Sequence, residues 1–366
     1  MTDDLKALRD IISSSVDSIT AACEAAGTPF PSLNDPIQPS EFTRHGIRSH
    51  PAVMHSVSLI LSAATRLIAT VQPPPATMII SYTLPASLGV VEAGNVAEIL
   101  RDAGPQGLHI NEIASKSGMD TKKLSRILRY LATEHWFREV SPDIFANNLL
   151  SSVLDSGKEI NEGFDRRSKH ENSKGMSAMA GYGADECIKS GSYLVEMMTD
   201  PNTKFSEEPN CSALQKAFNM TDTFFEFLDR PTEEYRRKRF ATVMARTNRG
   251  HTPTAIVESF DWETSEVSWE ENLPSHVAEG IVHFIGVDFF EEQPNLPGPV
   301  DVFLLRMIIH DWSDKYAAKI LRPLRNVAGP NTKLLIIDSI LDHVCGSGQE
   351  ATRPPSPMLP NLGGEP

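Results

Sequence analysis

Apolar residues in the first hundred positions recur at helical spacing. Near the start they are three or four residues apart, which places them on one face of a helix: Leu5, Leu8, Ile11, Ile12, Val16 and Ile19. A second helical pattern covers 52–71 and stops at Pro73-Pro74-Pro75, and a third apolar block, 78–100, is interrupted at Pro85 and Gly89. Amphipathic helices without strands favour an interaction module for this part of the chain.

The pattern changes between residues 107 and 147. Two helical segments, Ile110–Ser117 and Thr121–Thr133, are joined at Gly118 and followed by an alternating segment at 137–140. This order predicts a winged helix-turn-helix. Residues 111–138 contain six Lys or Arg against three Asp or Glu, so DNA binding is one interpretation of this unit. The basic side chains are equally explained as the solvated face opposite the leucines: Lys122, Lys123, Arg126 and Arg129.

The middle of the chain has a polar segment, which is followed by a segment rich in aromatic residues. Residues 151–210 are rich in turn formers and contain the charged run Asp165–His170, so we expect a surface excursion between domains. After Thr221 helical spacing returns with large apolar side chains, which we expect to belong to the core and not to a ligand site: Phe224, Phe225, Phe227, Leu228, Phe240, Val243 and Met244.

The last third of the chain alternates between strand and helix patterns. Short apolar runs at 281–285, 300–309 and 333–341 predict strands, and Asp314–Leu324 predicts an amphipathic helix. Such alternation indicates a parallel sheet. Residues 346–366 are rich in Gly, Ser and Pro, and we expect a disordered tail there. The predicted organisation is therefore a helical and winged-helix domain at 1–150, an α/β domain at 151–345, and the tail.

Composition excludes several classes of protein. Asp and Glu total 48 against 34 Lys and Arg, and this net charge of −14 argues against a protein that neutralises phosphates, so we expect no nucleic acid partner. The four cysteines lie too far apart for a zinc or redox pair, and no secretory leader is expected, which favours a reduced, cytoplasmic protein. Prolines interrupt the longest charge-free stretch, 67–91, so we expect no membrane segment.

Two side chains at the predicted sheet carry candidate chemistry. His310 follows the 300–309 strand, and Asp338 ends the next one, so neighbouring parallel strands would bring them together at the carboxyl edge where such sheets place ligands. A carboxylate beside an imidazole fixes its tautomer, which suits removal of a proton from a hydroxyl. The alternative is a plain structural hydrogen bond. Ser313 is placed to cap the following helix. Asp311 and Asp314 would then interact with the positive N-terminal end of that helix and not with a substrate.

The order of several motifs resembles the fungal and plant O-methyltransferase family. These are Asp288-Phe289-Phe290, Asp301–Arg306, His310-Asp311-Trp312-Ser313-Asp314 and the strand Leu335–Leu341. The resemblance implies an N-terminal helical dimerisation and winged-helix region that does not bind DNA, followed by a Rossmann-like methyltransferase domain.

The resemblance also implies roles for residues. By position, His310 resembles the general base and Asp338 the acidic residue that orients it, while Asp288, Phe289 and Arg306 resemble contacts to the cofactor, S-adenosyl-L-methionine. No metal is implied. The implied partners are a small aromatic substrate with a hydroxyl group and, for the chain itself, a second copy or a homologous chain.

Part of the family pattern is missing. After Phe260-Asp261-Trp262 the family continues with a strand, a glycine-rich Asp-x-Gly-x-Gly-x-Gly turn and a helix, whereas this chain passes from Val267 directly to Trp269–Pro274. About one βαβ unit therefore appears deleted, and the C-terminal end is also expected to be incomplete. Gly181-Tyr182-Gly183 is a poor substitute for the missing turn. We expect weak or absent cofactor binding and an exposed apolar face on the incomplete sheet.

Two functions remain from the sequence. The first is methylation of a hydroxyl in secondary-metabolite biosynthesis, on an aromatic polyketide-like substrate with His310 as base. The second is a non-catalytic or repurposed relative, which acts as a dimer partner or as a cyclisation or pericyclic catalyst. An erroneous gene model or an alternatively spliced product would also produce the gap.

Overall fold

The computed structural model describes residues 2–37, 46–161, 164–165, 168–171, 173, 176–247, 286–294 and 298–338. Several sequence predictions lie outside these residues. They concern the segment 260–262, the junction after Val267, the strand at 281–285 and the tail at 346–366.

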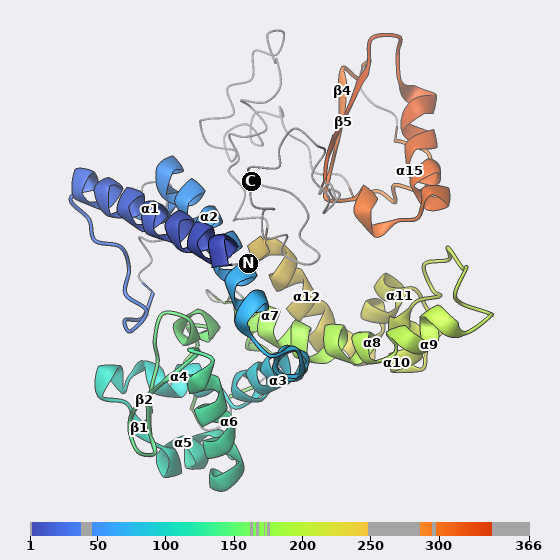
Figure 1. Cartoon of the computed structure of the whole chain (residues 1–366). Coiled ribbons are helices and arrows are strands. Elements are labelled where there is room, and N and C mark those ends of the chain that lie inside the picture. The colour runs from blue at the N-terminus through green and yellow to red at the C-terminus, as the bar shows by residue number, and fades with distance from the viewer. Residues whose placement is uncertain are drawn as a thin grey trace.

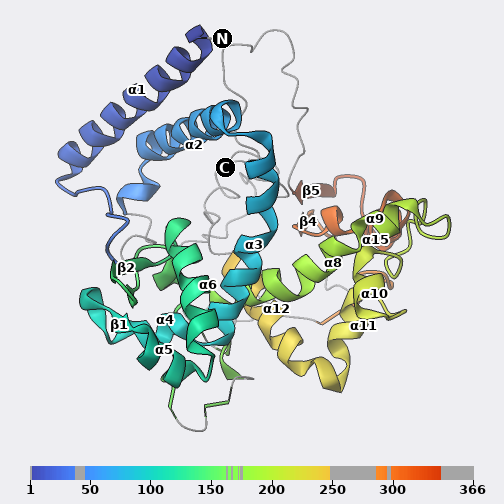
Figure 2. The ribbon, with the colours of Figure 1, turned by 60° about the horizontal axis from the view of Figure 1, so that its bottom comes forward.

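Two long helices begin the chain and lie side by side (Figures 1 and 2). They are α1 (Thr2–Ala26) and α2 (Pro51–Val71), preceded by the short turn η2 (Ile47–Ser49), and they confirm the first two helical predictions. By length and composition alone, α2 is apolar enough to cross a membrane, and 22% of its most apolar window is buried. The sequence analysis predicted no membrane segment and did not single out this helix.

The third helix, α3 (Pro74–Ala93), runs without interruption through Pro85 and Gly89. The predicted break at these two residues is therefore wrong. Proline removes one backbone hydrogen bond from a helix, but here α3 is packed against helices on more than one side. Gly89 serves close packing, because a Cβ atom there would lie 2.3 Å from the Cβ of Ala184.

The winged-helix region has the predicted form. Helices α5 (Ile110–Ser117) and α6 (Thr121–Thr133) have the bounds expected from the sequence, and the Asp120 side chain caps α6 by accepting the Lys123 N–H at 2.9 Å. A three-stranded antiparallel sheet of order β1-β3-β2 closes the unit. The remaining elements are α4 (Val96–Arg101), η3 (Gly104–Gln106), β1 (Leu108–His109), β2 (Arg138–Ser141), β3 (Ile144–Ala146) and η4 (Ser151–Leu154).

The core of this region forms a single cluster of buried side chains, which includes Ile113, Leu124, Leu128, Leu131, Phe137 and Phe145. The opposite face of α6 carries the basic residues. One of them, Arg129, is ion-paired with Asp143 at 2.6 Å and with Glu139 at 3.3 Å. Its charge is thus partly neutralised within the unit.

A helical segment follows, and it is not the surface excursion that we predicted. Lys169 and His170 of the charged run are only 2% and 1% exposed. Burial is possible because Lys169 Nζ lies 3.3 Å from Glu92 Oε1 and 3.2 Å from Glu98 Oε1. The elements are α7 (Ser177–Tyr182), the π-helix η6 (Gly183–Cys187), α8 (Ile188–Ser192), α9 (Leu194–Thr199), α10 (Ala213–Phe218), α11 (Phe224–Asp229), η7 (Pro231–Glu233) and α12 (Glu234–Thr247).

The C-terminal unit stands apart from the winged helix (Figure 1). Strands β4 (Val302–Arg306) and β5 (Lys333–Ile337) pair in parallel with Leu304 opposite Leu335, which confirms the predicted parallel pairing. The crossover is η9 (Ile309–Asp311) followed by α15 (Asp314–Val327).

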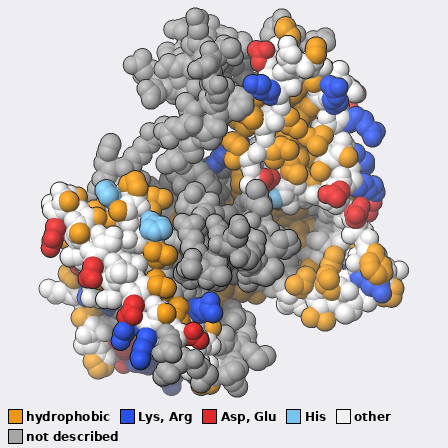
Figure 3. Space-filling model, turned by 45° about the horizontal axis from the view of Figure 1, so that its top comes forward, with side chains coloured by type: hydrophobic (Ala, Val, Ile, Leu, Met, Phe, Trp, Pro, Cys, Tyr) orange, Lys and Arg blue, Asp and Glu red, His pale blue; other side chains and the backbone are white. Residues whose placement is uncertain are grey.

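Both strands of the C-terminal unit leave apolar side chains in solvent. Leu304, Leu334 and Ile336 are between 43% and 48% exposed, which agrees with the exposed apolar face predicted from the sequence. Figure 3 shows apolar side chains gathered on this unit, at the upper right of the view. Among the described residues the sheet has two strands.

Candidate functional site

The carboxyl end of β4 carries a sharp backbone turn that places His310. Met307 follows the strand with a positive φ of 54°, a conformation that costs energy for a residue with a side chain. Its N–H donates to the carbonyl oxygen of Ile337 at 2.9 Å, which ties the turn to β5. The chain then enters η9, whose middle residue is His310. His310 therefore stands at the edge of the sheet where we predicted it.

The structure brings His310 and Asp338 together. The backbone N–H of His310 donates to Asp338 Oδ2 at 3.1 Å, and ring atom Nδ1 contacts Asp338 Oδ1. The carboxylate is half-buried, with 13% of the side chain exposed, while 34% of the imidazole is exposed. A carboxylate at Nδ1 holds the proton there, so Nε2 is left as the acceptor that faces away from Asp338. This is the geometry that a general base requires.

A second carboxylate lies on the other side of the imidazole. Asp311 Oδ1 is 3.4 Å from His310 Nε2, and 58% of the Asp311 side chain is exposed. Partial burial raises the pKa of Asp311, the nearby His310 lowers it and the Asp338 charge raises it. Asp311 thus lies where its carboxylate would stabilise a positive charge on the imidazole.

The predicted cofactor contacts lie at the same end of the unit. Phe289 is half-buried and packs edge-to-face on Trp312, two residues from His310, with ring centroids 5.9 Å apart. Asp288 is exposed, and its Oδ1 accepts the Phe290 N–H at 2.9 Å. Arg306 is the last residue of β4 and is half-buried. Four rings form one cluster there: Phe289, Phe290, Trp312 and Tyr316.

The His310 segment also contacts the helical region. Ser313 occupies the N-cap position of α15 as predicted, but its side chain makes no capping bond. Its hydroxyl instead donates to the carbonyl oxygen of Glu207 at 3.2 Å. The adjacent Glu208 contacts Lys315 and accepts the Tyr316 hydroxyl at 2.5 Å. The predicted cap is therefore replaced by a contact between the two parts of the chain.

Sequence reasoning did not single out the tyrosine at the end of α7. Tyr182 ends α7, where burial raises the pKa of its hydroxyl. The sequence presented it only within Gly181-Tyr182-Gly183, which we considered as a poor glycine loop. The structure places all three residues in a continuous helix. A π-turn has no sequence signal of its own, so this position could not be found from periodicity.

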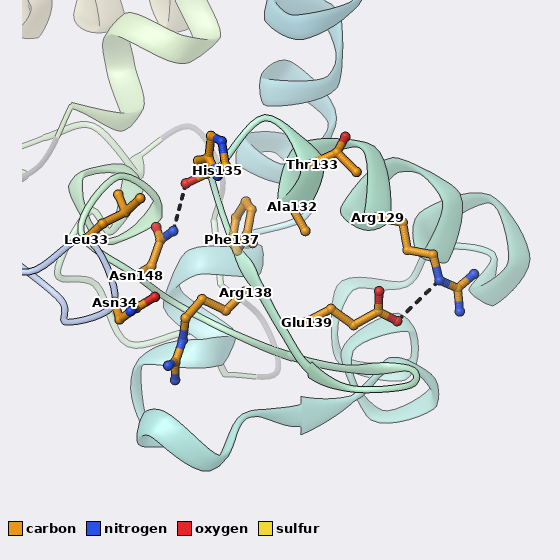
Figure 4. A pocket seen from close by; sticks show the side chains of 10 residues that line it. All are labelled: Leu33, Asn34, Arg129, Ala132, Thr133, His135, Phe137, Arg138, Glu139 and Asn148. Carbon is orange, nitrogen blue, oxygen red and sulfur yellow. Dashed lines mark hydrogen bonds and ion pairs between the residues drawn. The ribbon is translucent and has the colours of Figure 1, made fainter.

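A surface pocket of about 510 Å³ lies elsewhere, at the winged helix (Figure 4). It is lined by Leu33 and Asn34 of the N-terminal segment and by residues such as Phe137 and Arg138, and none of the predicted site residues contributes to it. Among the described residues, no group of three His, Cys, Asp or Glu side chains is arranged to hold a metal ion.

Comparison with known sequences identifies relatives along the whole chain. A family model for the O-methyltransferase domain matches residues 241–354. An O-methyltransferase of Armillaria gallica is 37% identical over 415 residues, which cover 99% of this chain and 87% of the relative. The 4-O-methyltransferase 1 of Phanerochaete chrysosporium is 32% identical over 417 residues, which again cover 99% of this chain and 87% of the relative. Both aligned stretches are longer than the 366 residues of this chain, so the relatives contain internal residues that it lacks.

Solved structures agree on the fold. A pericyclic reaction enzyme superposes with a TM-score of 0.58 at 16% identity over 79% of each chain. LepI in complex with SAM superposes with a TM-score of 0.55 at 16% identity over 76% of each chain. The fold is thus an N-terminal helical region followed by a Rossmann-like domain. With relatives more than 30% identical over nearly its whole length, the chain belongs to the O-methyltransferase family.

Proposed function

We propose that this protein is an S-adenosyl-L-methionine-dependent O-methyltransferase that methylates a hydroxyl group of an aromatic secondary metabolite, with His310 as general base. The observation that carries the proposal is the His310–Asp338 pair at the carboxyl edge of the parallel strands. Its Nε2 atom is available to take the hydroxyl proton, and Asp311 at 3.4 Å then stabilises the charged ring. The imidazole is one-third exposed, so a substrate can reach it.

The described residues fit one end of the cofactor. Asp288 has an exposed carboxylate suited to an amino group, and Phe289 beside Trp312 offers an aromatic surface suited to adenine. The described glycines near the site do not form a cradle, because a Cβ atom at Gly286 or Gly298 would meet open space. When bound, S-adenosylmethionine supplies the methyl group that the deprotonated hydroxyl accepts. The chain's own contribution is the proton transfer to His310 and the positioning of the hydroxyl.

The test measures binding and transfer separately. Calorimetric titration with S-adenosylmethionine reports whether the cofactor binds, and incubation with 2-methoxyphenol or 1,8-dihydroxyanthraquinone reports methyl transfer. Because the sequence lacks the glycine turn, we expect cofactor binding to be weak and transfer by the native chain to require millimolar cofactor. Transfer should be lost in His310→Asn and kept in the control His50→Asn, at the N-terminus of α2. A native chain that neither binds the cofactor at millimolar concentration nor methylates either phenol contradicts the proposal.

A second function is favoured by the residues that the chain lacks. Its relatives carry additional internal positions, and the sequence contains no Gly-x-Gly-x-Gly turn. A pericyclic reaction enzyme has the same fold. In this alternative the His310–Asp338 pair moves a proton during a cyclisation without methyl transfer. Consumption of a substrate with no change in methyl content, in the absence of cofactor binding, would favour it.

We further propose that the chain forms a homodimer through α2. Three apolar residues seven positions apart, Met54, Leu61 and Ile68, are 42%, 53% and 55% exposed. At this spacing they form one stripe along the helix. A matching stripe from a second copy, or from a homologous chain, would cover it. Light scattering of the purified protein gives the oligomeric state directly.

A further inference from the structure

The segment between α9 and α10 is anchored to the helical region at both ends. It comprises residues 200–211, which we call the arm. At its start the Asp200 carboxylate pairs with Lys216 of α10 at 2.7 Å. Near its other end the Asn210 side chain donates to the carbonyl oxygen of Thr221 at 3.1 Å. These two anchors fix where the tip of the arm lies.

The tip of the arm contacts the beginning of α15, and Figure 2 shows α9 and α10 beside that helix. The carbonyl oxygen of Glu207 accepts the Ser313 hydroxyl at 3.2 Å. The Glu208 carboxylate accepts the Tyr316 hydroxyl at 2.5 Å and contacts Lys315 Nζ. Hydrogen bonds from Lys315 and Tyr316 lower the pKa of Glu208, so its carboxylate is charged at neutral pH. A charged acceptor makes these bonds stronger than bonds between neutral groups.

The beginning of α15 is continuous with the turn that carries His310. The Trp312 N–H donates to the carbonyl oxygen of Ile309 at 3.1 Å, and the Tyr316 N–H donates to that of Ser313 at 2.9 Å. The Trp312 ring stacks on the Tyr316 ring with centroids 5.9 Å apart. A displacement of Tyr316 or Ser313 would therefore move the turn around His310.

Tyr316 also belongs to the ring cluster beside His310. Phe290 packs edge-to-face on Tyr316 with centroids 6.0 Å apart and on Trp312 at 4.7 Å. Phe289 packs edge-to-face on Trp312 at 5.9 Å. By holding the Tyr316 hydroxyl, Glu208 thus supports both the His310 turn and the aromatic surface next to it.

We propose that Glu208 is a positioning residue for methyl transfer, which fixes His310 and the ring cluster relative to the helical region. The inference rests on the proposed function, because it takes His310 as the base. Glu208 and Lys315 are 43% and 46% exposed, and exposed ion pairs contribute little to the stability of a protein. The contact therefore acts on the geometry of the site and not on the folding of the chain.

The test compares Glu208→Gln with Glu207→Gln. The second variant removes the same charge at the adjacent position and keeps the backbone carbonyl that binds Ser313. Weakening of the hydrogen bond to Tyr316 predicts a kcat for 2-methoxyphenol about three- to tenfold lower in Glu208→Gln, at an unchanged melting temperature. KM should change less than kcat, since the arm does not contact the substrate. Glu207→Gln should keep the native kcat.

Tyr316→Phe tests the same contact from its other side. The change keeps the stack on Trp312 and removes the hydroxyl that donates to Glu208. It should also lower kcat, and the double variant Glu208→Gln/Tyr316→Phe should be no slower than Glu208→Gln alone, because both changes disrupt one interaction. Losses that add in the double variant, or equal kcat values for Glu208→Gln and Glu207→Gln, overturn the proposal.

A measurement without the methyl donor separates this inference from the proposed function. NMR spectra of protein with ¹³C-labelled histidine report the surroundings of the His310 ring, whose signal is assigned by its absence in His310→Asn. Glu208→Gln and Tyr316→Phe should shift or broaden this signal, and Glu207→Gln should not. A His310 signal that is unchanged in both Glu208→Gln and Tyr316→Phe overturns the inference. If the signal responds as expected but the native chain transfers no methyl group, the proposed function alone is refuted.

Discussion

The carboxylate of Asp338 contacts His310 twice, accepting its backbone N–H at 3.1 Å and touching Nδ1 of its ring. The first contact fixes the η9 turn to the end of β5, and the second fixes the ring within that turn. A single side chain therefore sets both the place and the tautomer of the imidazole. This relationship depends on the parallel pairing of β4 and β5, which ends at Arg306 and Ile337.

Asp338→Asn should separate these two effects. The amide can still accept the backbone N–H but can present an N–H to the ring, which favours the wrong tautomer. We expect kcat for methylation to fall at least tenfold, though by less than the about 10²–10⁴-fold contribution of the base itself. The pH profile of kcat should change as well. Asp314→Asn, at the exposed start of α15, is the control. An unchanged kcat in Asp338→Asn would show that the pair is only structural.

The turn at Met307 provides a second test of the site. A β-branched residue is poorly tolerated at a φ of 54°, so Met307→Val should misplace His310. Unfavourable φ values cost about 1–3 kcal/mol, and we expect a loss of this order in the free energy of unfolding together with a lower kcat. Met307→Gly keeps the turn and is the matched control. Equal stability and kcat of the Val and Gly variants would contradict the importance of the turn.

The sequence patterns predicted the helices and strands better than they predicted which side chains are buried. The bounds of α5 and α6 follow from hydrophobic spacing together with Asp120 and Gly118, all of which act locally. The parallel pairing of β4 and β5 follows from their separation by a helix. The buried position of Lys169 could not be read in this way, because it depends on Glu92 and Glu98, more than seventy positions away. Charge in a sequence indicates exposure only when no distant partner exists.

The same distinction between local pattern and long-range packing applies to the residues of the candidate site. His310 and Asp338 were predicted to meet because strand ends define one edge of a sheet. The continuity of α3 through Pro85 and Gly89, and the position of Tyr182, depend on the packing of α3 against η6. That packing joins segments that are nearly a hundred residues apart, and periodicity along one segment contains no information about it.

The buried ion cluster of Lys169, Glu92 and Glu98 predicts a large effect on stability. Lys169→Met leaves two buried carboxylates without their cation, which typically costs about 3–5 kcal/mol. Adding Glu98→Gln should recover part of this loss. The control is Lys189→Met, which removes an exposed partner of Asp185 and should cost at most about 1 kcal/mol. Urea unfolding of the native chain and the three variants measures these differences, and equal losses for Lys169→Met and Lys189→Met would refute the prediction.

His170, beside the same cluster, predicts a pH dependence of stability. Burial lowers the pKa of His170 to about 3, and the charges of Lys169 and Arg239 add to this effect. Between pH 6.5 and 3 the unfolded chain binds a proton that the folded chain excludes. The contribution of His170 to the free energy of unfolding therefore falls with decreasing pH, by up to about 1.4 kcal/mol per pH unit.

His170→Gln should remove this contribution. The slope of unfolding free energy against pH between 6.5 and 4 is expected to be shallower in the variant than in the native protein. His55→Gln alters an exposed histidine of α2 and should keep the native slope. If both variants keep it, His170 is protonated in the folded protein and the predicted linkage is absent.

The stripe on α2 leads to a prediction about assembly. Leu61 lies between Met54 and Ile68, so Leu61→Glu places a charge at the centre of the proposed dimer contact. A buried, unpaired carboxylate there would oppose association, and we expect light scattering to show a monomer at concentrations where the native chain is a dimer. His55→Glu adds the same charge on a neighbouring face of α2 and should leave the dimer intact. A native chain that is already monomeric, or a Leu61→Glu variant that remains dimeric, would mean that the stripe does not join two copies.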